Sequence, residues 1–119
     1  MPTLPNELRR GDVVRVRLDP VEGSEQAGER PGLILSPDDV NKHSPVVLVA
    51  SLTSKRTDRV FAFEARLDPP DGGLSLTSKV MLMQLRSINK TRLLGYYGRV
   101  SDEAMRRVDQ ALRVAVGLR

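Results

Sequence analysis

Cysteine and tryptophan are both absent from this 119-residue chain, and His43 is its one histidine. The lack of cysteine excludes disulfides, thiolate metal ligands and a cysteine nucleophile. A single histidine also excludes a multi-histidine metal cluster within one chain. Only two phenylalanines and two tyrosines are present, so the core has to be built from aliphatic side chains.

Long apolar runs are also missing. No stretch of about 18 apolar residues occurs, so the sequence predicts no membrane-spanning helix. The opening MPTLPNELRRGD lacks the apolar segment of a signal peptide. We therefore expect a soluble, cytoplasmic protein. Its length suits a single domain over residues 1–119, and 39% apolar residues suit a packed core rather than disorder.

Positive charge is concentrated toward the end of the chain. Residues 86–119 carry eight Arg and Lys against three acidic residues, whereas residues 1–85 carry eleven against twelve. A basic segment beside a neutral one indicates a polyanionic or acidic partner. A solvated basic surface accounts for the charge equally well.

Alternating and apolar segments predict about six short strands. In residues 12–18, valines and a leucine alternate with Arg15 and Arg17, which is typical of a half-buried strand. Residues 45–50, PVVLVA, are continuously apolar and predict the central strand. The remaining strands are predicted at residues 32–35, 59–66, 79–85 and 93–100.

The connections are polar or rich in proline and glycine. Residues 19–31 predict a loop of thirteen residues, and ordered loops of that length in compact domains are more often functional than idle. Residues 36–44 predict a turn or a single helical turn, and residues 68–73 predict a turn.

The last segment changes to a helical period. Ser101 suits an N-cap and Gly117 suits a C-terminal cap. Apolar residues at helical spacing lie between them: Ala104, Val108, Ala111, Leu112 and Ala115. The order of elements predicts a mainly β protein, a compact β-barrel closed or capped by a C-terminal α-helix.

Few familiar catalytic motifs are present. There is no GxxxxGK[ST], GxGxxG or HExxH motif, and His43 stands alone in a polar turn, which leaves no Ser-His-Asp set. Polar residues gather instead at the predicted strand ends. These are Glu25, Gln26, Glu29 and Arg30 on the long loop, Thr53 and Ser54 after the central strand, and Gln84 and Arg86 two apart on one strand face.

Such a set suits metal-independent RNA cleavage, in which a ribose 2′-hydroxyl attacks the adjacent phosphate. Arg30 can donate two hydrogen bonds to phosphate oxygens, and Thr53 can donate one more. The products would be a 2′,3′-cyclic phosphate and a 5′-hydroxyl. Simpler roles remain open: an ion pair of Arg30 with Glu25 or Glu29, and a strand-end hydroxyl of Thr53 bonded to its own backbone.

The segment from Gly11 to Asn41 reads GDVVRVRLDPVEGSEQAGERPGLILSPDDVN and closely resembles the opening of MazF/PemK toxins. Its most specific part is GSEQxGxRP. Later pieces fit in the same order: Leu52-Thr53-Ser54 after an apolar strand, Ser78-Lys79-Val80 followed by Gln84 and Arg86, and Arg92-Leu93 before the terminal helix. The similarity covers nearly the whole chain.

This resemblance implies an SH3-like barrel of the CcdB/MazF type, paired into a homodimer. It implies a sequence-selective endoribonuclease of a type II toxin–antitoxin system that cleaves single-stranded RNA. No cofactor or metal is implied, and a MazE-like antitoxin, acidic and partly disordered, would inhibit the enzyme. By the same resemblance Arg30 and Thr53 are the catalytic residues. The implied RNA-binding residues are Ser24, Glu25, Gln26, Ser54, Gln84 and Arg86.

One segment departs from the family. Residues 55–59, within KRTDRVF, replace a stretch that varies in length among members and on which base selectivity is thought to depend. Some relatives also use a histidine on the first loop as general base, and none lies there in this chain.

Two other functions fit the predicted fold. A CcdB-like toxin binds gyrase through the terminal helix and lacks the Arg-Pro and Thr-Ser pair, which this chain has. A non-catalytic RNA-binding barrel usually needs stacking aromatics. The one adjacent aromatic pair is Tyr96 and Tyr97, and we expect at least one of them to point into the core.

Overall fold

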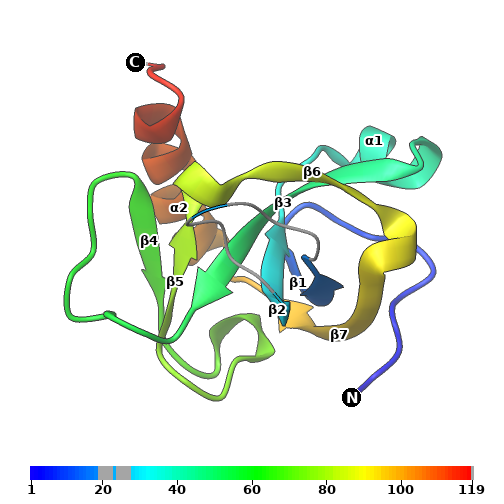
Figure 1. Cartoon of the computed structure of the whole chain (residues 1–119), viewed down its shortest axis with the longest axis horizontal. Coiled ribbons are helices and arrows are strands. Elements are labelled where there is room, and N and C mark those ends of the chain that lie inside the picture. Colours follow the sequence, from blue (N-terminus) through cyan, green and yellow to red (C-terminus); the bar gives the residue numbers. More distant parts are fainter. Residues whose placement is uncertain (19–22, 24–27, 119) are drawn as a thin grey trace.

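The computed structural model describes residues 1–18, 23 and 28–118. It confirms a mainly β fold with a C-terminal helix (Figure 1). The strands are β1 (Asp12–Arg17), β2 (Glu29–Ile34), β3 (Val46–Thr53), β4 (Glu64–Leu67), β5 (Ser78–Met81), β6 (Arg86–Asn89) and β7 (Leu93–Arg99). The α-helices are α1 (Asp38–His43) and α2 (Asp102–Ala115), and the short 3-10 helices are η1 (Asp71–Gly73), η2 (Leu82–Gln84) and η3 (Lys90–Arg92).

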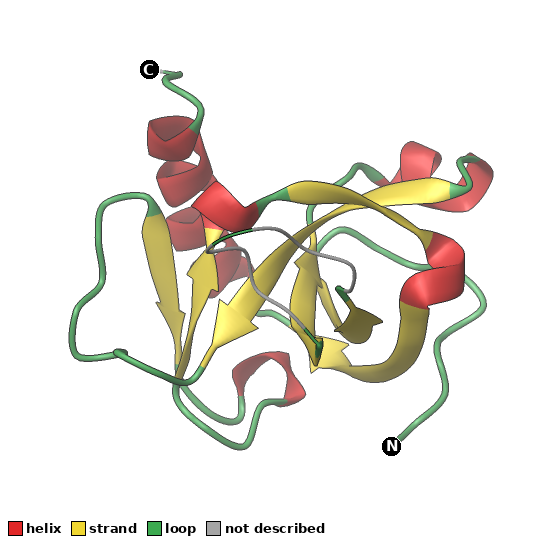
Figure 2. Cartoon of the chain, in the orientation of Figure 1, coloured by secondary structure: helices red, strands yellow, loops and turns green. Residues whose placement is uncertain are grey.

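All strand pairs are antiparallel, and the sheet order is β4-β5-β3-β2-β1-β7 with β6 also paired to β3 (Figure 2). Because β3 pairs with β2, β5 and β6, the prediction of a central strand there is confirmed. Within the part of the chain that the structure describes, β4 and β7 do not pair with each other. The curved sheet is therefore open, and backbone hydrogen bonds do not close it into a barrel.

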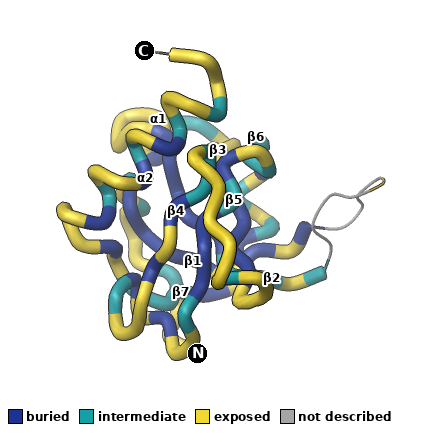
Figure 3. Tube along the Cα trace, turned by 90° about the vertical axis from the view of Figure 1, so that its left-hand side faces the viewer, coloured by how far each residue is buried: buried dark blue, intermediate teal, exposed yellow. Residues whose placement is uncertain are grey.

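Two aliphatic cores lie on opposite faces of the sheet. Much of the central strands is buried (Figure 3). One core packs under α2 and includes Val13, Leu33 and Leu52. The other packs under the N-terminal segment and includes Val14, Ile34 and Val49. Tyr97 packs against the first core and Tyr96 against the second, which confirms the expectation that at least one tyrosine turns inward.

Helix α2 follows the local sequence signals closely. The Ser101 side chain accepts a hydrogen bond from the Ala104 backbone N–H, as expected of an N-cap. Gly117, at φ 74°, has the left-handed conformation of a C-terminal cap. Arg10 pairs with Asp109 at 2.6 Å and so ties the helix to the start of β1. The five predicted apolar residues all pack into the core: Ala104, Val108, Ala111, Leu112 and Ala115.

Three predicted boundaries are wrong. Strand β4 begins at Glu64 rather than residue 59, because residues 59–63 form a loop in which Phe61 stacks on Phe63 instead of entering the core. The strand predicted at residues 79–85 ends at Met81, where the chain turns into η2, and β6 follows as a strand that the sequence analysis missed. Strand β3 continues to Thr53, three residues beyond the predicted end.

The long first loop is shorter than predicted, because β2 starts at Glu29 and already contains Arg30 and Pro31. Pro31 is paired with Arg15 of β1. The rest of the predicted loop, residues 19–22 and 24–27, lies outside the described residues. Arg30 is thus held by a strand rather than by a loop.

Candidate active site

Arg30 and Thr53 lie on neighbouring strands, β2 and β3. The observed register pairs Gly32 with Ser51 and Leu33 with Ala50. Continued by two residues, this register brings Arg30 opposite Thr53. Residues that are opposite each other in an antiparallel pair project from the same face of the sheet. The sheet therefore brings together two residues that lie far apart in the sequence.

Both residues line one cavity of about 230 Å³ at the end of their strands. Thr53 is only 8% exposed, and Arg30 is half-buried. The lining also includes residues that follow η1 and Tyr97 of β7. The full lining is Arg30, Pro31, Leu52, Thr53, Ser54, Leu74, Ser75, Leu76, Ser78 and Tyr97. An arginine, a threonine and three serines therefore line this cavity.

The Thr53 hydroxyl also bonds to nearby backbone, which is the simpler role considered from the sequence. Its Oγ1 accepts a hydrogen bond from the Lys55 N–H at 3.1 Å. A hydroxyl has one proton to donate as well as lone pairs to accept with. The bond to Lys55 orients the oxygen and leaves the hydroxyl proton available for a ligand, so the structural and the catalytic roles are compatible.

Gly32 lets the strands approach closely beside Arg30. A Cβ at this position would lie 2.5 Å from Cγ1 of Val49 and 3.2 Å from Cγ1 of Val16. Contacts that short would force these valine side chains, or the strands that carry them, to shift. The glycine two residues after Arg30 therefore allows Val49 and Val16 to pack closely against β2.

Glu29 does not form the ion pair with Arg30 that the sequence left open. Its carboxylate binds Arg15 Nη2 at 2.6 Å instead. Successive side chains in a strand project from opposite faces, so Glu29 points away from the face that carries Arg30. Glu25, the other acidic candidate, lies outside the described residues, as do Ser24 and Gln26.

Gln84 and Arg86 do not share one strand, and that prediction is wrong. Gln84 ends η2, whereas Arg86 begins β6 and pairs with Val49 of β3. The guanidinium of Arg86 donates to the Leu18 carbonyl at 3.1 Å. Val49 and Thr53 are four residues apart on β3, so Arg86 lies on the same face as Thr53 but farther along the strand. Neither residue lines the Arg30–Thr53 cavity.

Ser54 lies next to Thr53 at the end of β3, and His43 lies apart from the candidate site, both as predicted. Ser54 is exposed and lines the cavity next to Thr53. His43 ends α1, is exposed, and lies 3.1 Å from the Asp39 carbonyl through Nδ1. It is not part of the cavity lining.

Lys79 is a residue that sequence reasoning missed. It is paired with Thr53 in the sheet, on the side of Thr53 away from β2. Its side chain is only 6% exposed and forms an ion pair with Glu64 at 3.0 Å. The available signal was a lysine at the start of the strand predicted at residues 79–85, because lysine is rarely buried without a partner.

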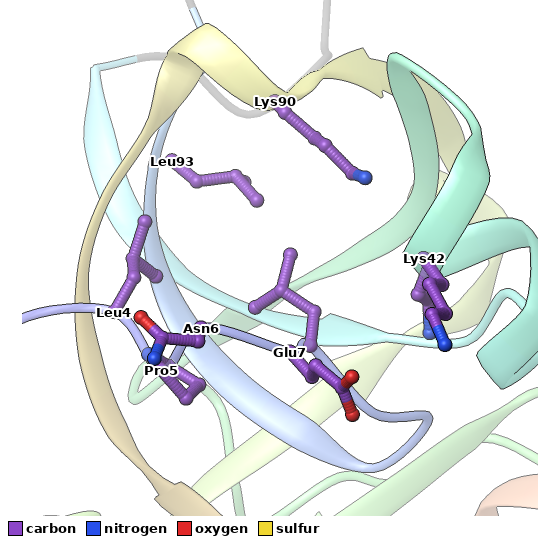
Figure 4. Close-up of a pocket in the computed structure, with 9 residues that line it drawn as sticks. Leu4, Pro5, Asn6, Glu7, Lys42, Lys90 and Leu93 are labelled. Carbon is purple, nitrogen blue, oxygen red and sulfur yellow. The ribbon is translucent and has the colours of Figure 1, made fainter.

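A second cavity, of about 210 Å³, lies under the N-terminal segment and contains none of the site residues (Figure 4). Lys42 and Lys90 face Glu7 and Leu4 across it. Nearby, burial raises the pKa of Tyr96, and the adjacent Asp12 carboxylate adds to the rise.

Two absences hold for residues 1–18, 23 and 28–118. No three His, Asp or Glu side chains there gather closely enough to hold a metal ion. In the same residues, no helix is long and apolar enough to cross a membrane.

Comparison with known proteins gives consistent matches. The family model described as PemK-like, MazF-like toxin of type II toxin-antitoxin system matches residues 9–116. A protein named Endoribonuclease MazF from Staphylococcus saprophyticus is 36% identical over 111 residues, covering 93% of this chain and 92% of that protein. Among solved structures, an endoribonuclease in complex with its cognate antitoxin, from a mycobacterial species, is 29% identical, with a TM-score of 0.79 over 94% of this chain and 97% of that chain. MazF from Deinococcus radiodurans shares the fold, with a TM-score of 0.81 and 23% identity. The match covers 96% of this chain and 100% of that chain.

The fold and these matches define the class, a toxin with the MazF architecture. The chain belongs to the family of PemK-like, MazF-like toxins of type II toxin–antitoxin systems, and its enzyme class is endoribonuclease. The CcdB-like alternative, a gyrase-binding toxin without ribonuclease activity, is not supported.

Proposed function

We propose that the Arg30–Thr53 cavity is the site at which this toxin cleaves single-stranded RNA, without a metal ion and with selectivity for sequence. The observation that carries the proposal is the placement of a half-buried arginine and a buried threonine on neighbouring strands at the wall of one cavity. We further propose that residues 1–119 act as one domain in the cytoplasm.

The reaction forms a bond between the ribose 2′-oxygen and phosphorus and breaks the bond from phosphorus to the 5′-oxygen. The 2′-hydroxyl proton passes to a base, and the leaving 5′-oxygen gains a proton. Arg30 donates two hydrogen bonds to the non-bridging oxygens, and Thr53 donates a third. Their positions are set by the sheet before substrate arrives, and such preorganised donors often supply the largest catalytic effect. The products are a 2′,3′-cyclic phosphate and a 5′-hydroxyl.

RNA on either side of the reacting phosphate has further partners in this proposal. Ser54 continues the cavity wall beside Thr53. Arg86 lies farther along the same face of β3 and carries a positive charge suited to a flanking phosphate. The remaining proposed contacts are Ser24, Glu25, Gln26 and Gln84.

Two protein partners are proposed. A second copy of this chain would cover apolar side chains that β3 leaves partly open, Val46 at 39% and Leu48 at 41% exposed, and so form a homodimer. A monomer mass in light scattering at micromolar concentration would contradict this.

The second partner is a MazE-like antitoxin, acidic and partly disordered, that blocks the RNA site; the mycobacterial relative is known in complex with its cognate antitoxin.

The test is incubation of the purified toxin with a set of single-stranded RNAs, followed by mass spectrometry of the fragment ends. We expect cyclic phosphate and 5′-hydroxyl ends at defined sequences. Arg30→Ala should abolish most cleavage, while Arg106→Ala, the same change at an exposed position on α2, should retain it. Full activity of a folded Arg30→Ala protein would contradict the proposed site.

A further inference from the structure

The loop that joins β3 to β4, residues 54–63, is strongly basic. It contains Lys55, Arg56 and Arg59 against a single acid, Asp58. It leaves β3 directly after Thr53 and runs along the left edge of the molecule in Figure 1 before β4 begins. In Figure 3 it passes as an exposed segment in front of buried strands. Its positive charges therefore begin at the wall of the candidate active site.

One end of this loop is tied down by Lys79. The ammonium of Lys79 donates to the Arg59 carbonyl at 2.8 Å and to Glu64 Oε1 at 3.0 Å. Glu64 Oε1 also accepts the Phe61 backbone N–H at 3.1 Å. A single buried pair thus holds the backbone of the loop at two points, Arg59 and Phe61.

Side-chain contacts reinforce the same end. The rings of Phe61 and Phe63 stack with centroids 5.3 Å apart. The Lys79 ammonium lies 5.9 Å from the Phe61 centroid, and the Arg59 guanidinium lies 5.8 Å from it. Both distances fall in the range of favourable cation–π contacts. The other end of the loop is held by Thr53 Oγ1, which accepts the Lys55 N–H at 3.1 Å.

We propose that Lys79 is a positioning residue that holds the basic loop 54–63 beside the Arg30–Thr53 cavity, where the loop binds RNA phosphates next to the one that reacts. This inference rests on the proposed ribonuclease function. Stability alone gives little reason for the buried pair, because well-packed apolar residues are often as stable as a buried ion pair. The pair instead fixes the position of the loop. Lys79 is paired with Thr53 in the sheet and donates to the Arg59 carbonyl, so β5 positions the loop relative to the catalytic candidate.

The test uses a double variant, Glu64→Gln with Lys79→Met. Removal of one charge alone would leave the other buried without a partner and endanger folding. The double change removes both charges. The amide oxygen introduced by Glu64→Gln can still accept from the Phe61 N–H. The hydrogen bond that is lost is therefore the one from Lys79 to the Arg59 carbonyl. Lys42→Met on α1 is the matched control, because it removes a lysine charge at an exposed position away from the loop.

Three quantities are measured on the full chain. The first is the rate of trypsin cleavage after Lys55, Arg56 and Arg59, which reports how often the loop opens. The second is the Kd of a 2′-O-methyl RNA, which cannot be cleaved, at several salt concentrations. The third is the single-turnover cleavage rate at saturating RNA.

We expect the double variant to be cut by trypsin several times faster within the loop and to bind RNA about 5–20-fold more weakly. The slope of log Kd against log salt should fall in magnitude by about 1–2, as for the loss of one or two phosphate contacts. Cleavage at saturating RNA should stay within about threefold of the wild type, because Arg30 and Thr53 are retained. A purely structural role would not change the salt slope.

Each contrary result has a distinct meaning. An unchanged trypsin rate in the double variant would overturn the anchoring role of Lys79. A released loop with unchanged RNA affinity and salt slope would overturn RNA binding by the loop. An equal loss of affinity in Lys42→Met would show a general charge effect and overturn the inference as well. Absence of cleavage by the wild-type protein would instead refute the proposed function, whatever the loop does.

Discussion

Thr53 and Lys55 are joined by a hydrogen bond from the Lys55 backbone N–H to the Thr53 hydroxyl oxygen, 3.1 Å long. The bond fixes the oxygen of a side chain that is only 8% exposed. It occurs where β3 ends and the basic loop begins, so one hydroxyl connects the catalytic candidate to the segment that follows it.

This hydroxyl can be tested with two conservative changes. Thr53→Ser keeps the hydroxyl, and we expect it to retain cleavage within about tenfold. Thr53→Val keeps the shape and removes the hydroxyl, and we expect cleavage to fall by roughly 10²–10³-fold, the scale for loss of one preorganised donor. Single-turnover assays on a fluorogenic RNA measure both. Equal rates for the valine and serine variants would remove Thr53 from the mechanism.

Arg30 and Thr53 should act on the same transition state. Arg30→Ala is expected to slow cleavage by roughly 10²–10³-fold or more. Combined with Thr53→Ala, the loss should be smaller than the product of the separate losses, because both donors serve the same oxygens. Uncleavable RNA should bind more weakly to Arg30→Ala than to Thr53→Ala, since only arginine carries charge. Thermal melting of each variant checks that the fold is retained, and fully multiplicative losses would show that the two residues act independently.

Cleavage should persist in excess EDTA, because the proposed chemistry needs only side-chain donors and proton transfers. The assay is the initial cleavage rate with chelator, compared with the rate after extensive dialysis alone. Loss of activity that magnesium or manganese restores would require a metal-dependent mechanism and would remove the central role given to Arg30.

Binding of the antitoxin should weaken as salt rises. Residues 86–119 have a strong excess of positive charge, and an acidic partner would be attracted to them electrostatically. Calorimetric titration of the toxin with its antitoxin at several sodium chloride concentrations measures the dependence. An affinity that does not change between low and high salt would show that apolar contacts, not charge, hold the complex.

The start of α2 offers a test of stability that is separate from activity. Asp71 accepts both the N–H and the hydroxyl of Ser101 at 2.8 Å, while Ser101 caps the Ala104 N–H. Ser101→Ala should lower the free energy of unfolding by about 1–2 kcal/mol, because it removes the cap and one bond to Asp71. Chemical denaturation measures the loss. Ser87→Ala, at an exposed position on β6, should change stability by less than about 0.5 kcal/mol, and cleavage should be unaffected in both variants.

The sequence was sufficient where structure depends on neighbours along the chain. The capping serine, the helical spacing and the final glycine of α2 were all predicted, because caps and helical period are local properties. The central strand was predicted from the β-branched apolar run of residues 45–50, which is typical of a strand inside a sheet, although Val46 and Leu48 stay partly exposed. Arg30 and Thr53 were singled out as residues of the right chemistry, and the family resemblance supplied their roles.

Tertiary structure decided which residues meet. The alternation around Phe61 and Phe63 is typical of a strand, yet the rings stack on each other in a loop that Lys79 and Glu64 hold. Strand formation depends on a partner edge and on burial, and the local pattern contains neither. Pairing register is equally non-local: it places Lys79 opposite Thr53 and, continued from Gly32 and Ser51, brings Arg30 to the other side. The fold of the sheet therefore decides which residues are the neighbours of Thr53, because hydrogen bonds between segments distant in the sequence determine which strands are adjacent.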